Sequence, residues 1–190
     1  IFKVGKELRT MSIMKNIFAV AEIVDDIPTE FAIYDLNELL ATYSIFSDCE
    51  VTFVYIMLIF SVPGEKIEYY HSSPSVVVSP GDKTIKLPSE DMSFVMTKEV
   101  LDKIIRSASI MKLKDLVIDK SGITILNRNT VGNKHNISLT VKCNDDDIKS
   151  KFFVKVENLK LIPTDYNVSV CKKGLMRFTS RNEEYPIEYH

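Results

Sequence analysis

A loose internal repeat constrains the fold more than any other feature of this sequence. Residues 31–53 begin as a half-buried strand, continue as an amphipathic helix that Asp35 can cap, and end in a second strand. Residues 152–170 follow the same plan with a shorter helix. The apolar stripe of the first helix is expected to consist of Leu36, Leu39, Leu40 and Tyr43. The repeat predicts two copies of one α+β unit, and 190 residues suffice for two small domains.

The composition changes between the two copies of the repeat. Residues 72–91 are rich in proline and small hydroxyl residues, which favours an extended connector over a packed element. We therefore expect an N-terminal domain at residues 1–71, an interdomain connector at 72–91 and a C-terminal domain at 92–190. Because the first residue is Ile1 rather than Met, we also expect this chain to begin inside a longer one.

The first domain shows short alternating segments. Residues 8–21 predict strands of a meander, with a turn at residues 25 and 26. The apolar run 51–62 is shorter than the roughly 18 residues of a membrane span, and it predicts one or two buried strands. Residues 63–64 predict a turn, and residues 66–70 an edge strand.

Residues 97–112 predict the longest helix, of about four turns. Thr97 is the expected N-cap, and Glu99 suits the positive end of the helix dipole. The expected buried stripe is Leu101, Ile104, Ile105, Ala108 and Met111 or Lys112. The opposite face carries Lys98, Asp102, Lys103, Arg106 and Ser109. For this helix taken alone, a solvated face is the favoured explanation of these cations, ahead of a binding face.

The rest of the chain predicts an antiparallel sheet of short strands. Strands are expected at 94–96, 115–119, 122–127, 136–142, 151–154, 166–171, 175–180 and 185–190. Turns are expected at 120–122, 131–133, 143–148 and 172–174, and a short helix at 156–162. Pro186 is expected to mark the last strand as an edge strand.

No group of residues predicts an enzyme, a metal site or a cofactor. The three histidines lie in separate elements, and there is no glycine-rich phosphate loop and no nucleophile elbow. The acidic run 145–147 lacks the alternating ligands and central glycine of a calcium loop. The three cysteines have no paired spacing and are expected to be reduced thiols in a reducing cytosol. They are Cys49, Cys143 and Cys171.

Charge is unevenly distributed along the chain. The net charge of −2 argues against a protein that coats nucleic acid, yet cations crowd residues 98–114. Acidic residues gather instead in the expected turns. A weakly acidic protein with one basic lining is therefore expected.

Four segments resemble the DNA polymerase sliding clamps, or processivity factors, of T-even-type bacteriophages and their marine phage relatives. They are IYDLNELL (33–40), SSPSVVVSPGDKTIKLP (72–88), TKEVLDKIIRSASIMKLKDLVI (97–118) and FFVKVENLKLIPTDYNVSV (152–170). Two departures stand out. The family begins with an extra helix and strand that precede the first residues of this chain, and it has a polar turn near residues 54–60, where this chain is continuously apolar.

The resemblance implies the α+β DNA clamp fold, with two similar domains of antiparallel sheet and helices that face a pore. It implies a homotrimeric ring that encircles duplex DNA, tethers a polymerase and is loaded by a separate ATPase in the cytoplasm of an infected bacterial cell. No cofactor and no membrane are implied. The residues expected to face DNA are Lys98, Lys103, Arg106, Lys112, Lys114 and Lys160. Such cations contact phosphates without reading sequence.

In the family, partners insert a short hydrophobic peptide into a groove beside the connector and the C-terminal end. The expected groove residues are Val76, Val77, Ile85, Leu87, Pro186 and Ile187. These residues could equally cover the junction between the domains. Two other functions stay open at this point, namely a monomeric DNA polymerase processivity subunit and a structural β-rich phage protein.

Overall fold

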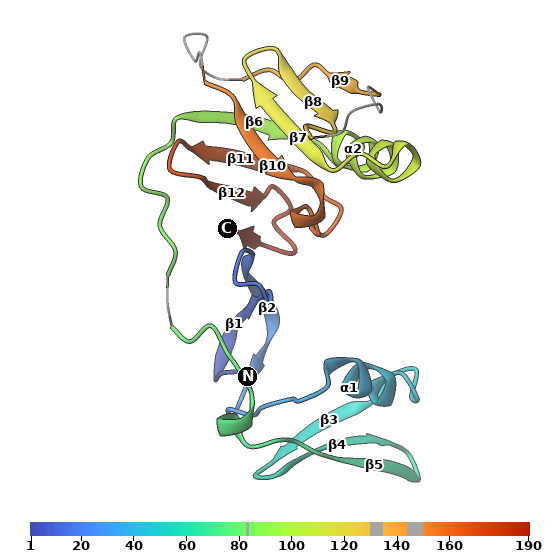
Figure 1. Ribbon diagram of the computed structural model, residues 1–190. Coiled ribbons are helices and arrows are strands. Elements are labelled where there is room, and N and C mark those ends of the chain that lie inside the picture. Colours follow the sequence, from blue (N-terminus) through green and yellow to red (C-terminus); the bar gives the residue numbers. More distant parts are fainter. Residues whose placement is uncertain (83, 130–134, 144–149) are drawn as a thin grey trace. The chain divides into compact units, whose positions relative to one another are not determined.

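The computed structural model describes residues 1–82, 84–129, 135–143 and 150–190, and its strands pair in antiparallel fashion (Figure 1). The chain forms two compact units. Unit 1 comprises residues 1–10 and 22–82, and unit 2 comprises residues 11–21 and 83–190. The turns predicted at 131–133 and 143–148, and the acidic run 145–147, lie wholly or mostly outside the described residues.

The long apolar run of unit 1 forms two strands of a three-stranded sheet. The sheet contains β3 (Glu50–Val54), β4 (Met57–Val62) and β5 (Glu65–Tyr70), in that order. Val54 pairs with Met57, so Tyr55 and Ile56 form a two-residue hairpin turn and are exposed. The predicted turn at 63–64 is confirmed, and Gly64 supplies the positive φ of 87° that it requires. β5 is an edge strand of this sheet, as predicted.

Helix α1 (Leu36–Tyr43) begins as predicted but buries less than expected. The Asp35 carboxylate accepts hydrogen bonds from the amides of Asn37 and Glu38, at 2.9 and 3.2 Å. Of the predicted stripe only Leu39 is buried, whereas Leu36, Leu40 and Tyr43 are 50%, 55% and 47% exposed. The expectation for these three residues is wrong, because the unit 1 core reaches α1 from one side only. That core is Ile27, Phe31, Ile33, Leu39, Leu58 and Phe60.

The N-terminal meander is a hairpin of β1 (Gly5–Met11) and β2 (Phe18–Ile27). Its turn is closed by the Ser12 hydroxyl, which accepts hydrogen bonds from the amides of Asn16 and Ile17. The turn predicted at residues 25 and 26 is wrong, because both residues lie inside β2. Burial of Ile27 in the core keeps the strand extended past these acidic residues.

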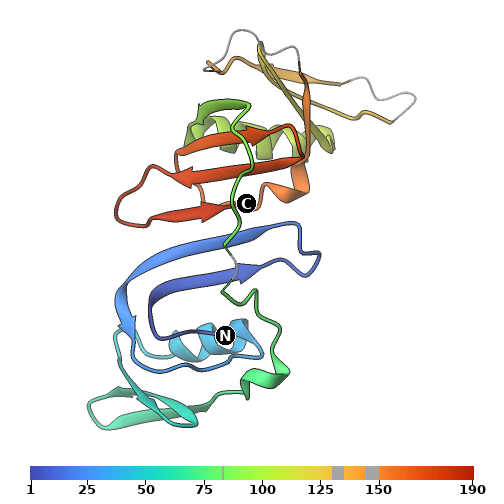
Figure 2. The ribbon, with the colours of Figure 1, turned by 90° about the vertical axis from the view of Figure 1, so that its left-hand side faces the viewer.

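Unit 2 contains two antiparallel sheets and helix α2 (Lys98–Met111) (Figures 1 and 2). The first sheet has the order β10 (Phe152–Lys155), β7 (Asp115–Asp119), β8 (Gly122–Leu126), β9 (Ile137–Leu139). The second contains β6 (Met92–Met96), β11 (Tyr166–Cys171), β12 (Leu175–Ser180) and β13 (Ile187–Tyr189). Residues 19–21 of β2 pair with β13. β13 is therefore paired on both sides, so the expected edge strand is wrong. Pro186 precedes the paired residues and needs no ladder hydrogen bond.

Helix α2 packs one face into the core of unit 2. The Thr97 hydroxyl caps it by accepting from the Val100 amide, as predicted. Leu101, Ile104 and Ala108 are buried, whereas Ile105 is 40% exposed, which corrects one position of the expected stripe. The helix ends at Lys112, which adopts the left-handed conformation with φ 53°.

The helix predicted at 156–162 is wrong. Only one 3-10 turn, η2 (Val156–Asn158), forms there, and a similar turn, η1 (Pro74–Val76), lies in the connector segment. Leu159 leaves helical geometry at φ −86° and ψ 41°, and its side chain is buried. The Val156 amide donates to the Lys114 carbonyl, and this bond holds the segment against the end of α2.

Candidate nucleic-acid and partner-binding surfaces

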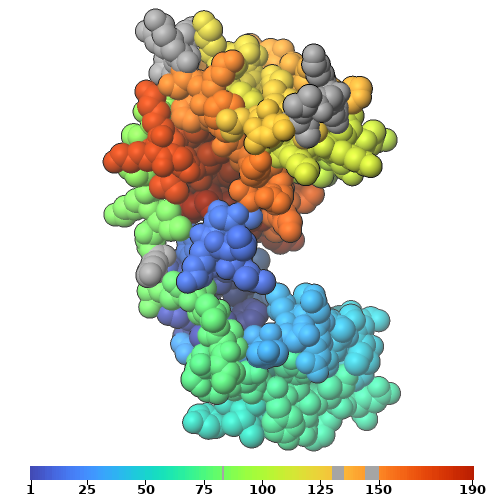
Figure 3. Space-filling view, viewed as in Figure 1, coloured from blue at the N-terminus to red at the C-terminus, as the bar shows by residue number. Residues whose placement is uncertain are grey.

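The polar face of α2 is exposed as expected. Lys98, Lys103 and Arg106 point away from the buried stripe, and α2 forms part of the visible surface of unit 2, in yellow-green in Figure 3. Residues 98–114 carry five cations against two carboxylates, Glu99 and Asp102. This segment is therefore cationic in a chain whose net charge is −2.

A groove of about 1360 Å³ lies between α2 and η2, and we call it the α2–η2 groove. Its walls are largely apolar and include Ile105, Ile110, which is 71% exposed, and Leu113. Two carboxylates, Asp102 and Glu157, line it together with four cations, namely Arg106, Lys114, Lys155 and Lys160. The structure thus brings together three of the residues predicted to face DNA and adds Lys155. The other three, Lys98, Lys103 and Lys112, do not line this groove.

The turn that carries Lys112 and Lys114 is held by Asn127, the residue that follows β8. The Asn127 carboxamide accepts a hydrogen bond from the Lys114 amide at 2.9 Å and donates one to the Lys112 carbonyl at 3.0 Å. Two backbone groups of a left-handed turn are thereby satisfied by one side chain. This bridge fixes where the two lysine side chains leave the backbone.

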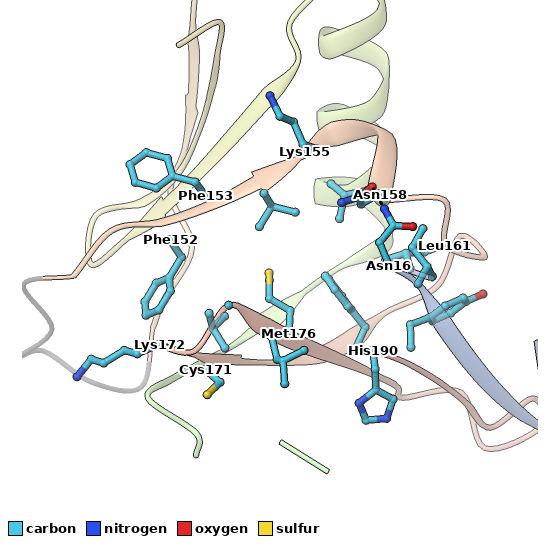
Figure 4. Close-up of a pocket in the computed structure, with 18 of the residues that line it drawn as sticks. Asn16, Phe152, Phe153, Lys155, Asn158, Leu161, Cys171, Lys172, Met176 and His190 are labelled. Carbon is cyan, nitrogen blue, oxygen red and sulfur yellow. Dashed lines mark hydrogen bonds between the residues drawn. The ribbon is translucent and has the colours of Figure 1, made fainter. Parts of the chain in front are cut away.

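A second hollow, the β10 cavity, lies between β10 and the β11–β12 hairpin and has a volume of about 410 Å³ (Figure 4). Phe152 and Met176 extend into the same space from opposite sides. Its apolar lining includes Phe152, Val154, Leu161, Val170, Met176 and Phe178. At one end Asn16 donates to the Asn158 carboxamide oxygen at 2.9 Å.

The charged residues that line the β10 cavity are all basic. They are Lys151, Lys155 and Lys172, although the Lys155 side chain leaves the cavity for Asp115, and no aspartate or glutamate of the described residues lines it. Each lysine has an acidic partner outside the cavity, at 3.9 Å for Lys151–Asp119 and 3.6 Å for Lys172–Asp91. The Lys172 amide and the Ser89 hydroxyl donate to Asp91 and lower the pKa of this carboxyl below its ordinary value.

The residues predicted for the peptide groove are divided between the two units. Val76 and Val77 belong to unit 1, and Ile85, Leu87, Pro186 and Ile187 belong to unit 2. Val76 is 61% exposed, Pro186 is exposed, and the other four are half-buried. None of them lines the β10 cavity or the α2–η2 groove. Their grouping into one groove stays a prediction.

Within the described ranges no cluster of histidine, cysteine and acidic residues could hold a metal ion. The helices in the same ranges include none that is both long and apolar enough to cross a bilayer.

Comparison with known proteins identifies the family. The family model described as "gp45 sliding clamp, C terminal" matches residues 93–189. The chain belongs to the gp45 sliding clamp family. It is 28% identical to the sliding clamp of Vibrio phage KVP40, over 96% of this chain and 86% of the relative. The sliding clamp of Enterobacteria phage T4 is 24% identical, over 97% of this chain and 86% of the relative.

Solved structures confirm the α+β DNA clamp fold. The PCNA of A. fulgidus, solved with the C-terminal region of FEN-1 bound, superposes with a TM-score of 0.67 and 14% identity, over 99% of this chain and 84% of that one. The DNA polymerase III beta chain of Streptococcus pneumoniae superposes with a TM-score of 0.69 and 12% identity, over 97% of this chain and 53% of that one. The resemblance to phage sliding clamps stated from the sequence is likewise confirmed.

Sequence reasoning missed the β10 cavity and its lysines. The alternation of residues 152–155 indicates a strand, but only the strand order shows that β10 lies at a sheet edge. A weak local signal did exist, because two of the three lysines, Lys151 and Lys172, flank strand ends and have no acidic residue within two positions in the sequence.

Proposed function

We propose that three copies of this sliding clamp form a ring that encircles duplex DNA and tethers a replicative polymerase in the cytoplasm of an infected bacterial cell. The observation that carries the proposal is the cationic segment of α2 in a weakly acidic chain. A protein that slides must contact phosphates without reading bases, and lysine and arginine side chains do so through exchangeable, salt-sensitive contacts. The closed ring then keeps the protein on the DNA, although its affinity for the phosphates is weak.

The DNA-facing surface is proposed to consist of Lys98, Lys103, Arg106, Lys112, Lys114 and Lys160. Arg106 lines the α2–η2 groove from α2, Lys114 from the turn after it, and Lys160 from the segment after η2. This arrangement favours contacts to more than one phosphate along a DNA strand. Because the sequence has no phosphate-binding loop, ring opening is assigned to a separate clamp-loader ATPase.

The exposed stripe of α1 supports a contact between subunits. Leu36, Leu40 and Tyr43 form an apolar surface next to Asp35 and Glu38. The α2–η2 groove is assigned to DNA, so this stripe is proposed to contact a different surface of the next copy. A contact between unlike surfaces of two copies is heterologous, and it produces a closed ring when the rotation between copies closes.

The β10 cavity is proposed as the site for a partner's peptide. It is the hollow of unit 2 that the close-up shows, and its lining includes the C-terminal residues Tyr189 and His190 (Figure 4). The PCNA of A. fulgidus binds the C-terminal region of another protein, FEN-1. A polymerase tail is the corresponding partner expected for this chain.

Two measurements test the ring. Light scattering at micromolar concentration should give the mass of three chains, about threefold the 21.7 kDa of one. After loading by the cognate ATPase, the protein should stay on a closed circular duplex and leave a linear one. A stable monomer that is retained equally on both would instead support a monomeric processivity subunit.

A further inference from the structure

We infer that a partner peptide binds the β10 cavity as an added β-strand on the free edge of β10, with apolar side chains inside the cavity and acidic residues at its ends. This inference rests on the proposed clamp function only for the identity of the partner as a protein tethered to the ring. The binding mode itself follows from β10, from the cavity and from the three lysines.

The first observation is the free edge of β10. Within the described residues β10 pairs with β7 alone and ends its sheet. All five consecutive residues 151–155 line the cavity. Side chains of a strand alternate between two faces, so Phe152 and Val154 reach the cavity with their side chains, whereas Phe153 and Lys155 line it through their backbone.

The two faces of β10 are consistent with this geometry. Phe152 and Val154 are partly buried and pack against the unit 2 core. Phe153 and Lys155 use the other face, where Arg128 lies 3.8 Å from the Phe153 ring centroid and Lys155 contacts Asp115. The cavity therefore lies against the Phe152 and Val154 face of β10, beside a backbone edge that no described strand pairs. Such an edge is a template for an incoming extended chain.

The β10 cavity can accommodate the side chains of an incoming peptide. Its volume of about 410 Å³ lies within the range of pockets that bind ligands, roughly 300–1,000 Å³. Val170 and Phe178 form buried parts of its wall, and Met176 can adjust to different shapes because its side chain is unbranched. An added strand would direct every second side chain into this space.

The charge around the cavity selects the class of peptide. Lys151 and Lys172 are 63% and 59% exposed, and their contacts with acidic partners, at 3.9 and 3.6 Å, are too long for strong hydrogen bonds. Both ammonium groups can therefore turn toward a ligand at little cost. Because no aspartate or glutamate of the described chain lines the cavity, a peptide with Asp or Glu beside its apolar residues meets lysines there, and its carboxylates compete with Asp119 and Asp91 for Lys151 and Lys172.

The probe is a displayed library of random linear dodecamers, selected against the intact ring. We expect the selected peptides to alternate apolar with other residues and to carry Asp or Glu at one or both ends. Lys172→Glu should weaken binding at least tenfold. The matched control is Lys173→Glu, because this neighbouring exposed lysine does not line the cavity, and it should change binding less than twofold.

The backbone of the best selected peptide tests the added strand directly. Methylation of single amide nitrogens should reduce binding tenfold or more at every second position and leave the positions between them unaffected. Equal tolerance at all positions, a selected sequence with helical spacing, or no binder that depends on Lys172 would overturn the inference.

Retention on circular DNA is measured on the same preparation. Intact retention with no alternation rejects the added strand alone, whereas failure of the protein to stay on the circle rejects the proposed ring.

Discussion

Lys155 of β10 stands directly opposite Asp115 of β7, and its ammonium donates a hydrogen bond of 2.6 Å to the Asp115 carboxylate. Asp115 is only 6% exposed, and the Arg128 amide donates a second hydrogen bond at 3.1 Å. Burial of this carboxyl opposes its ionisation, but the two hydrogen bonds outweigh burial, and the pKa of Asp115 lies below its ordinary value. The pair ties the edge strand of the sheet to the start of β7.

This pair predicts how stability depends on pH. Because the pKa of Asp115 is lower in the folded than in the unfolded chain, its contribution is fully present above the unfolded value of about 3.9 and is lost as the pH falls through the folded value. Asp115→Asn should lower the free energy of unfolding by about 1–3 kcal/mol at pH 7, where it removes a charged hydrogen-bond acceptor. Denaturant unfolding at pH 7 and pH 3 gives the free energy of unfolding of the unchanged protein and of Asp115→Asn. The difference between them should shrink at pH 3, and a constant difference would contradict this assignment.

The end of α2 gives a second prediction. Lys112 caps the helix in the left-handed conformation, which costs a residue with a Cβ atom about 1 kcal/mol and costs glycine nothing. Lys112→Gly should therefore raise the free energy of unfolding by a few tenths to about 1 kcal/mol. The control is Lys112→Ala, which removes the same charge but keeps the Cβ atom. Thermal unfolding should rank glycine above alanine, and the reverse order would exclude the left-handed cap.

Features that depend on neighbouring residues alone are predictable from this sequence. The Asp35 and Thr97 caps are of this kind, because a cap bonds amides two or three positions along the chain. The exposure of Leu36 and Leu40 is not, since periodicity reveals an apolar face but not whether another element covers it. The helix expected before Pro163 fails for a tertiary reason, because burial of Leu159 ends the turn early.

The candidate sites also divide into those visible in local sequence and those that only the folded chain brings together. The cations of α2 are visible in the sequence because one helix carries them. The α2–η2 groove adds Lys155 from a strand, and the β10 cavity joins residues 16 and 17 with residues between 151 and 190, so neither can be assembled from local spacing. Pro186 misleads in the same manner, because a proline that precedes a strand looks in sequence like one at an edge.

The DNA-facing assignment predicts a change in salt dependence. Arg106→Gln combined with Lys160→Gln should weaken duplex binding, and the slope of log affinity against log salt should fall by about 0.9 for each phosphate that the variant no longer neutralises. The control is Lys173→Gln, which removes an exposed cation at the β11–β12 turn, outside both hollows. Titrations of fluorescent duplex at several salt concentrations give both slopes. An equal change of slope in the control would show that only net charge matters.

The last prediction concerns the exposed stripe of α1. Leu40 is 55% exposed in a single chain, whereas Leu39 is 8% exposed and packs in the core of unit 1. If Leu40 lies between subunits, Leu40→Glu should convert the ring to monomers while unit 1 stays folded, because a carboxylate would lose its hydration in an apolar interface. Ala41→Glu is the matched control, since Ala41 is an exposed neighbour on the same helix outside the stripe.

Leu39→Ala separates folding from assembly. This change should lower the free energy of unfolding by about 2–4 kcal/mol, because it leaves a cavity in the core. Light scattering and thermal unfolding of the three variants are read together. Leu40→Glu should change mass without a comparable loss of thermal stability in the monomer, and Ala41→Glu should change neither. A Leu40→Glu protein that keeps the mass of three chains would remove α1 from the subunit interface, and the edges of the sheets would then have to hold the ring.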